Sequence, residues 1–168
     1  MSAEAIIRKF NLMPHPEGGY FTETYRASEE IAASAVPERF DGNRSHSTAI
    51  LFLLQAGDIS QLHRIKSDEV WHFYAGDPLH LFEVTPDGTV LETILGTDYA
   101  QGHVPQYVVK AGHYFGGFSS GTYSFVGCTV SPGFDFADFE FADHEALLAS
   151  FPAARSVIKR LSPVLNSD

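Results

Sequence analysis

The sequence predicts an all-β protein, and three observations support this prediction. Fourteen phenylalanines and seven tyrosines supply many of the residues that favour strands. Fourteen glycines and nine prolines supply many turns. Short apolar runs follow one another at intervals of about eight to twelve residues, with turn residues between them, which is typical of a β-sandwich or a closed barrel.

Length and composition restrict the classes of protein to which the chain can belong. We expect one domain over residues 1–168, because a chain of this length can bury a core of its own. The formal net charge of −10 argues against nucleic acid and membrane surfaces as partners, since both attract clustered lysine and arginine. The N-terminal residues, with Arg8 and Lys9 among them, are atypical of a signal peptide. A single cysteine, Cys128, allows no internal disulfide and favours a cytoplasmic location.

Helices are predicted only at the two ends of the chain. Ser2 can cap a short helix over residues 3–11. Asp143 can cap a second helix, and Pro152 occupies a position typical of the start of another. We therefore expect C-terminal helices over residues 143–162 that pack on the barrel.

Between these ends, the clearest hairpin has its turn at residues 85–89, between the apolar runs 79–84 and 90–95. Pro86 and the glycine two residues later are the turn residues that such a hairpin needs. Residues 27–46 are polar and show little periodicity, so we expect a surface loop there, either mobile or forming a lid over a pocket.

The stretch from Gly57 to Gly76 carries most of the chemical information. We interpret it as two strands joined by a polar turn at residues 66–68, so that side chains alternate between two faces. If the inner faces of the two strands coincide, a histidine and a carboxylate lie in an aromatic wall, which is typical of a small-molecule pocket. The residues on these faces are Gln61, His63, Ile65, Glu69, Trp71 and Phe73.

Each of these side chains also has a purely structural interpretation. Trp71 and Phe73 offer a stacking surface to a planar ligand, but aromatic residues in a barrel are commonly core. Gln61 can bind a ligand or lie near the mouth of the barrel. His63 and Glu69 can be a reactive pair, or a pair that only holds two strands together.

The spacing of Gly57, His63, Glu69 and Gly76 resembles the first conserved motif of the cupins, and residues 109–115 resemble the second. Four segments more specifically resemble an uncharacterised fifth cupin family: HPEGGY at 15–20, SQLHR at 60–64, DEVWHFY at 68–74 and GCTVSPGF at 127–134. The two glycines of the first segment indicate a sharp turn or a close backbone approach. The resemblance implies a double-stranded β-helix, the cupin jelly roll, usually as a homodimer, and no settled reaction.

Cupin metal sites normally use three histidines and one glutamate. By position, the resemblance retains His63 and Glu69, whereas Ile65 and Phe115 replace the other two ligands. Two protein ligands hold a transition metal weakly, so no cofactor is expected and a divalent metal is a minor alternative. The weak candidates for metal ligands are His63, Glu69 and His113.

Without a metal, His63 and Glu69 can exchange protons near neutral pH, because a nearby carboxylate favours the charged imidazole while burial opposes it. The resemblance extends to sugar-nucleotide epimerases of this fold, which use a histidine base and a tyrosine acid. It implies that His63 removes a proton next to a carbonyl, with Tyr20 or Tyr114 as the acid.

The first functional hypothesis is therefore a metal-independent isomerase or epimerase that acts on a small polar metabolite, with His63 and Glu69 as catalytic residues. The alternatives are a binding or sensing protein without catalysis and a metal-dependent enzyme. The predicted partners are a small-molecule ligand and a second copy of the chain. The residues expected to bind the ligand are Gln61, Ile65, Trp71, Phe73, Phe115 and Tyr20.

Overall fold

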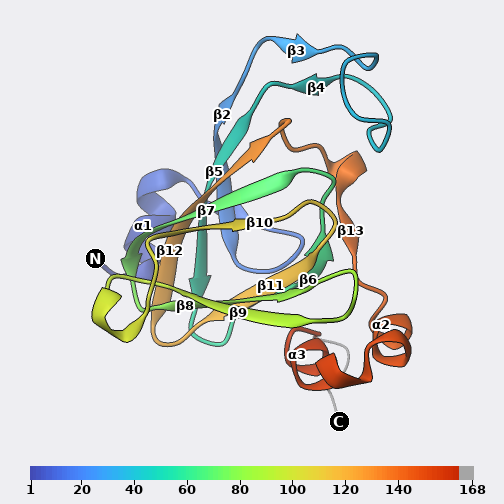
Figure 1. Ribbon diagram of the computed structural model, residues 1–168. Coiled ribbons are helices and arrows are strands. Elements are labelled where there is room, and N and C mark those ends of the chain that lie inside the picture. Colours follow the sequence, from blue (N-terminus) through green and yellow to red (C-terminus); the bar gives the residue numbers. More distant parts are fainter. Residues whose placement is uncertain (163–168) are drawn as a thin grey trace.

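The computed structural model describes residues 1–162, in which two antiparallel β-sheets pack face to face (Figure 1). The larger sheet contains, in spatial order, β1 (Met13–Pro14), β2 (Tyr20–Arg26), β5 (Thr48–Gln55), β12 (Tyr123–Ser131), β7 (Asp68–Gly76) and β10 (Gln106–Val109). The smaller sheet contains β13 (Glu140–Phe141), β6 (Ile59–Arg64), β11 (Tyr114–Ser119), β8 (Leu79–Val84) and β9 (Val90–Leu95). The predicted domain of residues 1–168 extends past the described residues.

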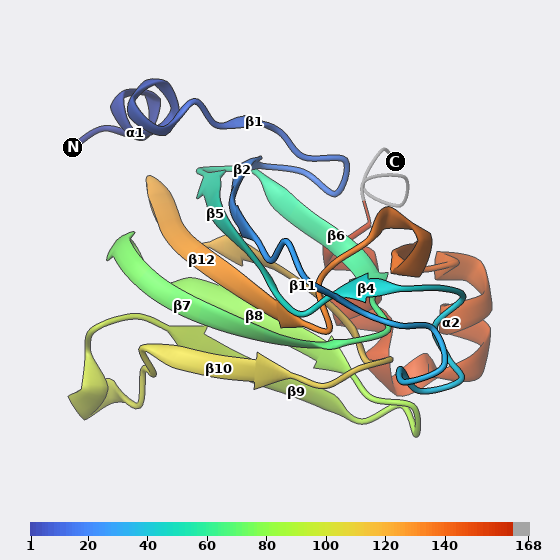
Figure 2. The same ribbon diagram turned by 90° about the horizontal axis from the view of Figure 1, so that it is seen from above.

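The helices lie at the two ends of the chain, as predicted, and cover different parts of the barrel (Figure 2). The first, α1 (Ala3–Phe10), is capped by the Ser2 hydroxyl and packs on the larger sheet. The C-terminal helices α2 (His144–Ser150) and α3 (Arg155–Arg160) flank the 3₁₀ turn η3 (Pro152–Ala154) and pack on the smaller sheet. Within residues 1–162, every helix is too short or too polar to span a membrane.

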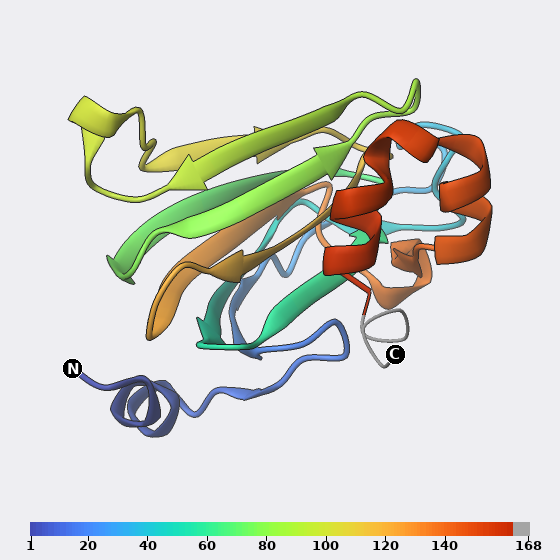
Figure 3. The ribbon, with the colours of Figure 1, turned by 90° about the horizontal axis from the view of Figure 1, so that it is seen from below.

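Two of the predicted turns connect strands in different ways. The predicted hairpin joins β8 to β9, with a turn in which the Thr85 N–H donates to the Thr89 carbonyl. The turn at residues 66–68 does not form a hairpin. The strand before it, β6, pairs with β11 and β13, whereas the strand after it, β7, pairs with β12 and β10. The turn therefore carries the chain from one sheet to the other, so that β6 and β7 belong to opposite layers (Figure 3).

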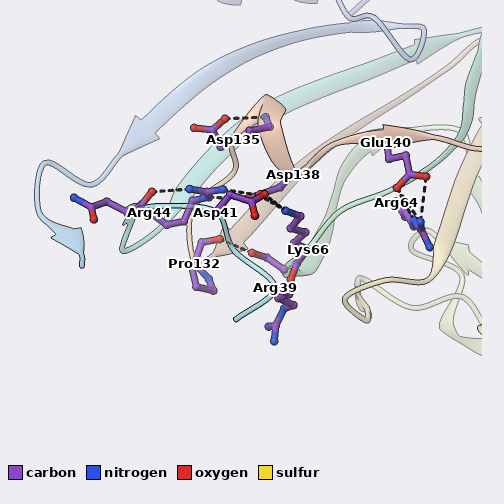
Figure 4. Close-up of polar contacts among 12 residues, drawn as sticks. Arg39, Asp41, Arg44, Arg64, Lys66, Pro132, Asp135, Asp138 and Glu140 are labelled. Atoms are coloured by element: carbon purple, nitrogen blue, oxygen red, sulfur yellow. Dashed lines mark hydrogen bonds and ion pairs between the residues drawn. The ribbon is translucent and has the colours of Figure 1, made fainter. Parts of the chain in front are cut away.

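Residues 27–46 differ from the predicted surface loop, because they contain the hairpin of β3 (Glu30–Ile31) and β4 (Arg44–Ser45). Arg44 joins this hairpin to the segment after β12 (Figure 4). Its Nε and Nη2 atoms donate to the two oxygens of Asp138 at 2.6 Å, and both side chains are at most 6% exposed. The hairpin is thus anchored by a buried, bidentate ion pair.

We expect the Arg44→Met variant to lose about 3 kcal/mol of unfolding free energy, because it leaves the buried Asp138 carboxylate without its principal partner. Arg64→Met is the matched control, since Arg64 forms an exposed ion pair with Glu140. Its loss should be about 0–1 kcal/mol. Urea unfolding at pH 7 measures both, and equal losses would contradict a structural role for the buried pair.

Candidate functional site

A cavity of about 80 Å³ lies between the two sheets. One water molecule needs only about 10–15 Å³, so the cavity has room for a small guest. Its buried acid–base groups are His15, Glu17, His63, Glu69 and Cys128. Its aromatic walls are Phe21, Phe52, Trp71, Phe134 and Phe136.

His63 lies between two polar partners and is 2% exposed. Its Nδ1 lies 2.7 Å from the Gln61 carbonyl oxygen, and its Nε2 lies 3.1 Å from Oε2 of Glu17. A carbonyl only accepts hydrogen bonds, so Nδ1 carries a hydrogen. The contact between Nε2 and Glu17 then holds one further proton, which belongs either to the carboxyl group or to the imidazole.

Glu17 is also buried, at 6% exposure, and its Oε1 accepts a hydrogen bond of 2.9 Å from the Ser60 hydroxyl. Burial raises the pKa of Glu17 and lowers the pKa of His63. Both shifts favour a pair without net charge, with a protonated Glu17 carboxyl group beside a neutral imidazole.

The turn that carries Glu17 depends on the two glycines that follow it. Gly18 and Gly19 have φ angles of 113° and 70°, a backbone region that other residues rarely adopt. A side chain on Gly18 would overlap the Ile59 carbonyl oxygen, and a Cβ on Gly19 would lie 2.6 Å from the Leu53 carbonyl oxygen. The turn therefore lies directly against β5 and β6, which confirms the close approach predicted from this segment.

His15 lies beside Glu17 on the cavity wall. Its Nδ1 accepts a hydrogen bond of 3.2 Å from the Glu17 backbone N–H, so in the neutral ring the hydrogen is on Nε2. Burial lowers the pKa of His15 and keeps the ring neutral. Phe21 contacts it edge to face, with a centroid distance of 4.4 Å.

Glu69 contributes the second carboxyl group from the opposite sheet and is 8% exposed. Burial raises its pKa to about 7, an effect that His63 opposes and Glu17 reinforces. The Cys128 thiol, whose own pKa is raised by burial, donates a hydrogen bond to Glu69. Glu69 can therefore give or accept a proton near neutral pH.

Four residues expected at the site line the cavity: His63, Ile65, Glu69 and Trp71. Phe115 packs against the His63 ring, with a centroid distance of 4.2 Å. Phe73 packs against the core between the sheets instead. Gln61 contributes its backbone carbonyl, because an irregularity in the pairing of β6 with β11 interrupts the alternation of side chains there.

The predicted tyrosine acids lie elsewhere in the structure, so this part of the hypothesis needs correction. Tyr20 packs beside α1 on the outside of the larger sheet. Tyr114 packs with the C-terminal helices, and the Arg64 guanidinium lies 4.8 Å from its ring centroid. The prediction assumed that an aromatic residue near the motif faces inward, and strand parity places both on the outer surfaces.

The side chains present do not fit the metal cage implied by the cupin resemblance. His113, a weak candidate for a ligand, instead bonds through Nδ1 to Oε2 of Glu83 at 2.8 Å. Both ring nitrogens of His63 have partners, and Ile65 and Phe115 are hydrocarbon. Within the described residues, no cluster of three or more histidine, cysteine, aspartate or glutamate side chains is arranged to hold a metal ion.

Sequence reasoning missed His15 and Glu17 as site residues, although it singled out their segment for its glycines. It also named none of the phenylalanines after β12 as site residues. Phe134 and Phe136 instead line the cavity, and Phe139 stacks on His63 with a centroid distance of 5.0 Å. One feature of the sequence could have identified Glu17 as a site residue. It precedes the two glycines of the HPEGGY segment, which resembles a family motif although it belongs to none of the predicted strands.

A two-sheet jelly roll with acid–base groups in the cavity between its sheets defines a cupin-type protein. The sequence model of a family described as cupin superfamily (DUF985), of unknown function, matches residues 4–142, and the chain belongs to this family. The predicted fold class is thereby confirmed.

Relatives agree with this assignment. An uncharacterised protein of Saccharomyces cerevisiae, YML079W, is 31% identical over 155 residues, which cover 86% of this chain and 77% of the relative. Protein SO0799 of Shewanella oneidensis has a similar solved structure, with a TM-score of 0.87, 37% identity and coverage of 96% and 98% of the two chains. Oxalate decarboxylase of Bacillus subtilis is similar in fold alone, with a TM-score of 0.55 and 15% identity over 89% of this chain and 36% of that enzyme.

The Gly18→Ala variant should lose about 2–4 kcal/mol of unfolding free energy, because the methyl group is strained at this φ angle and overlaps the Ile59 carbonyl oxygen. Gly102→Ala is the matched control, since Gly102 has a φ angle of 83° with open space around its Cβ. We expect about 1 kcal/mol there. Chemical unfolding compares the two, and a Gly18→Ala loss no larger than that of the control would contradict the close approach.

The pKa of Glu69 also predicts how stability depends on pH. The folded state keeps a proton that the unfolded state releases between the ordinary pKa of 4.5 and about 7, so the Glu69 contribution is lost as pH rises through this window. This difference between the two pKa values corresponds to about 3 kcal/mol of unfolding free energy. Subtracting the unfolding free energy of Glu69→Gln from that of the wild type, at pH 4.5 and pH 8, isolates this contribution. A difference independent of pH would contradict the raised pKa.

Proposed function

We propose that the protein is a metal-independent isomerase or epimerase that transfers protons next to the carbonyl group of a small metabolite. The observation that carries this proposal is the meeting of Glu69 with the Glu17–His63 pair in one buried, aromatic cavity. Two proton-exchanging groups in such a cavity are what a keto–enol step requires.

In the proposed step, the Glu17–His63 pair accepts the proton of the substrate carbon next to the carbonyl. The pair then holds two protons, as a carboxylic acid and an imidazolium. The C–H electron pair forms a C=C bond, and the carbonyl π electrons take the proton of Glu69 to give an enol. Return of a proton to the other face of the carbon, with the enol O–H proton going back to Glu69, gives an epimer. If the first carbon carries a hydroxyl group, return of the proton to the former carbonyl carbon, with that hydroxyl proton going to Glu69, gives an isomer, so no oxidant or reductant is needed.

The arrangement supports this function over two alternatives. A site that only bound a ligand would not need two carboxyl groups held in an apolar cavity, where each is costly to ionise. A metal-dependent enzyme would need ligands at positions 65 and 115, which are isoleucine and phenylalanine. The homodimer and the cytoplasmic location stay predictions, and light scattering of the purified protein tests the first.

Exchange of hydrogen for deuterium in D₂O tests the proposal directly. With dihydroxyacetone and hydroxyacetone as substrates, NMR should show deuterium entering the carbon next to the carbonyl faster than in buffer alone. The rate should decline as pH rises above about 7, because Glu69 must be protonated to donate. We expect Glu69→Gln and His63→Gln each to slow the exchange by about 100-fold or more.

The matched control is Glu83→Gln, which removes a carboxylate that is 2% exposed and bonds to Tyr107 and His113 outside the cavity. Its exchange rate should stay within about twofold of the wild type, since general acid–base effects are far larger. Thermal unfolding confirms that each variant is folded at the assay temperature. Absence of enhanced exchange in the wild type, or its persistence in His63→Gln, would contradict the proposal.

A further inference from the structure

Trp71 is a hydrogen-bond donor without an acceptor on the cavity wall. The side chain is 1% exposed, and its indole Nε1 is buried with no partner among the residues that the structure describes. Phe52 and Phe115 meet the indole edge to face, at centroid distances of 5.9 and 6.2 Å, and neither has a polar side-chain atom. A buried donor without an acceptor is destabilising, and a bound oxygen atom would supply the missing acceptor.

The cavity also lacks a free positive charge. Among the described residues of its lining, only Arg26 carries a permanent positive charge. Arg26 already donates to both Glu23 oxygens, at 3.0 and 2.7 Å, and to the Phe134 carbonyl at 3.1 Å. Burial keeps the two cavity histidines neutral. An anionic ligand would therefore meet two buried carboxyl groups, and the one permanent cation among the described lining residues is already paired with Glu23.

A cationic ligand fits less well for a different reason. An ammonium group would be attracted to Glu69, but it only donates hydrogen bonds. The indole N–H of Trp71 would then stay without an acceptor. An uncharged molecule with an accepting oxygen meets both conditions, since it satisfies the donor and adds no charge beside Glu17 and Glu69.

We infer that the cavity recognises an uncharged small carbonyl compound whose oxygen accepts a hydrogen bond from Nε1 of Trp71. Trp71 is then a specificity-determining donor, whereas the sequence left a stacking surface and a core position as its two interpretations. The inference rests on the ligand-binding part of the proposed function and holds whether or not proton transfer follows. The volume of about 80 Å³ restricts the ligand to few atoms.

The chain contains a single tryptophan, so a ¹⁵N-labelled sample has one indole cross-peak in its ¹H–¹⁵N spectrum. Two probes of matched shape are titrated: cyclopentanone, and methylenecyclopentane, in which a CH₂ group replaces the oxygen. Cyclopentanone should shift the indole proton downfield in a saturable manner. Methylenecyclopentane should bind about tenfold more weakly, which is the effect of one hydrogen bond of about 1.4 kcal/mol.

Two variants separate the donor from the shape of the wall. Trp71→Phe keeps an aromatic ring but removes the N–H, so the preference for cyclopentanone over methylenecyclopentane should fall from about tenfold to about onefold. Phe136→Leu is the control, because Phe136 also lines the cavity and is 54% exposed. It should change the affinities for both probes together and leave their ratio unchanged. The titration of the wild type with the two probes needs no variant, so it tests the inference even if Trp71→Phe does not fold.

Four results would overturn the inference: no binding of cyclopentanone, saturation by cyclopentanone without a shift of the indole signal, equal affinity for the two probes, or tighter binding of pyruvate or cyclopentylammonium than of cyclopentanone. The last would indicate a charged ligand. An indole shift without deuterium exchange would contradict only the proposed proton transfer. Deuterium exchange with an unmoved indole signal would contradict only the inference about Trp71.

Discussion

The site depends on one buried contact, in which Oε2 of Glu17 lies 3.1 Å from Nε2 of His63. Either group alone would be costly to bury in its charged form, and together they form a pair without net charge. The Gln61 carbonyl orients the His63 ring, and the Ser60 hydroxyl orients the Glu17 carboxyl group. Two acid–base groups can therefore lie in an aromatic cavity without a counterion from outside.

Three separate parts of the chain supply this arrangement. His63 comes from the smaller sheet, Glu69 from the larger sheet, and Glu17 from the glycine turn that precedes β2. Because the two sheets face each other, the turn at residues 66–68 brings His63 and Glu69 toward one interior although their strands do not pair. The segment after β12 completes the enclosure with Phe134 and Phe136.

The same geometry explains how this cupin differs from the metal-binding pattern that its sequence resembles. Ile65 lines the cavity and Phe115 packs on His63, so hydrocarbon occupies two of the four positions of the cage. In place of a metal ion, Nε2 of His63 contacts the carboxyl group of Glu17, which lies in the glycine turn before β2.

The sequence by itself determined the all-β class, the hairpin at residues 85–89, the capped terminal helices and the placement of His63 and Glu69 in one interior. These features follow from strand alternation, turn residues and helix caps, which act over a few neighbouring residues. Only the tertiary structure decided that Glu17 contacts His63, that Gln61 turns away at an irregular strand pair, and that Tyr20 and Tyr114 lie on outer surfaces. Such contacts join distant parts of the chain, and they depend on sheet pairing and strand register, which local sequence patterns do not specify.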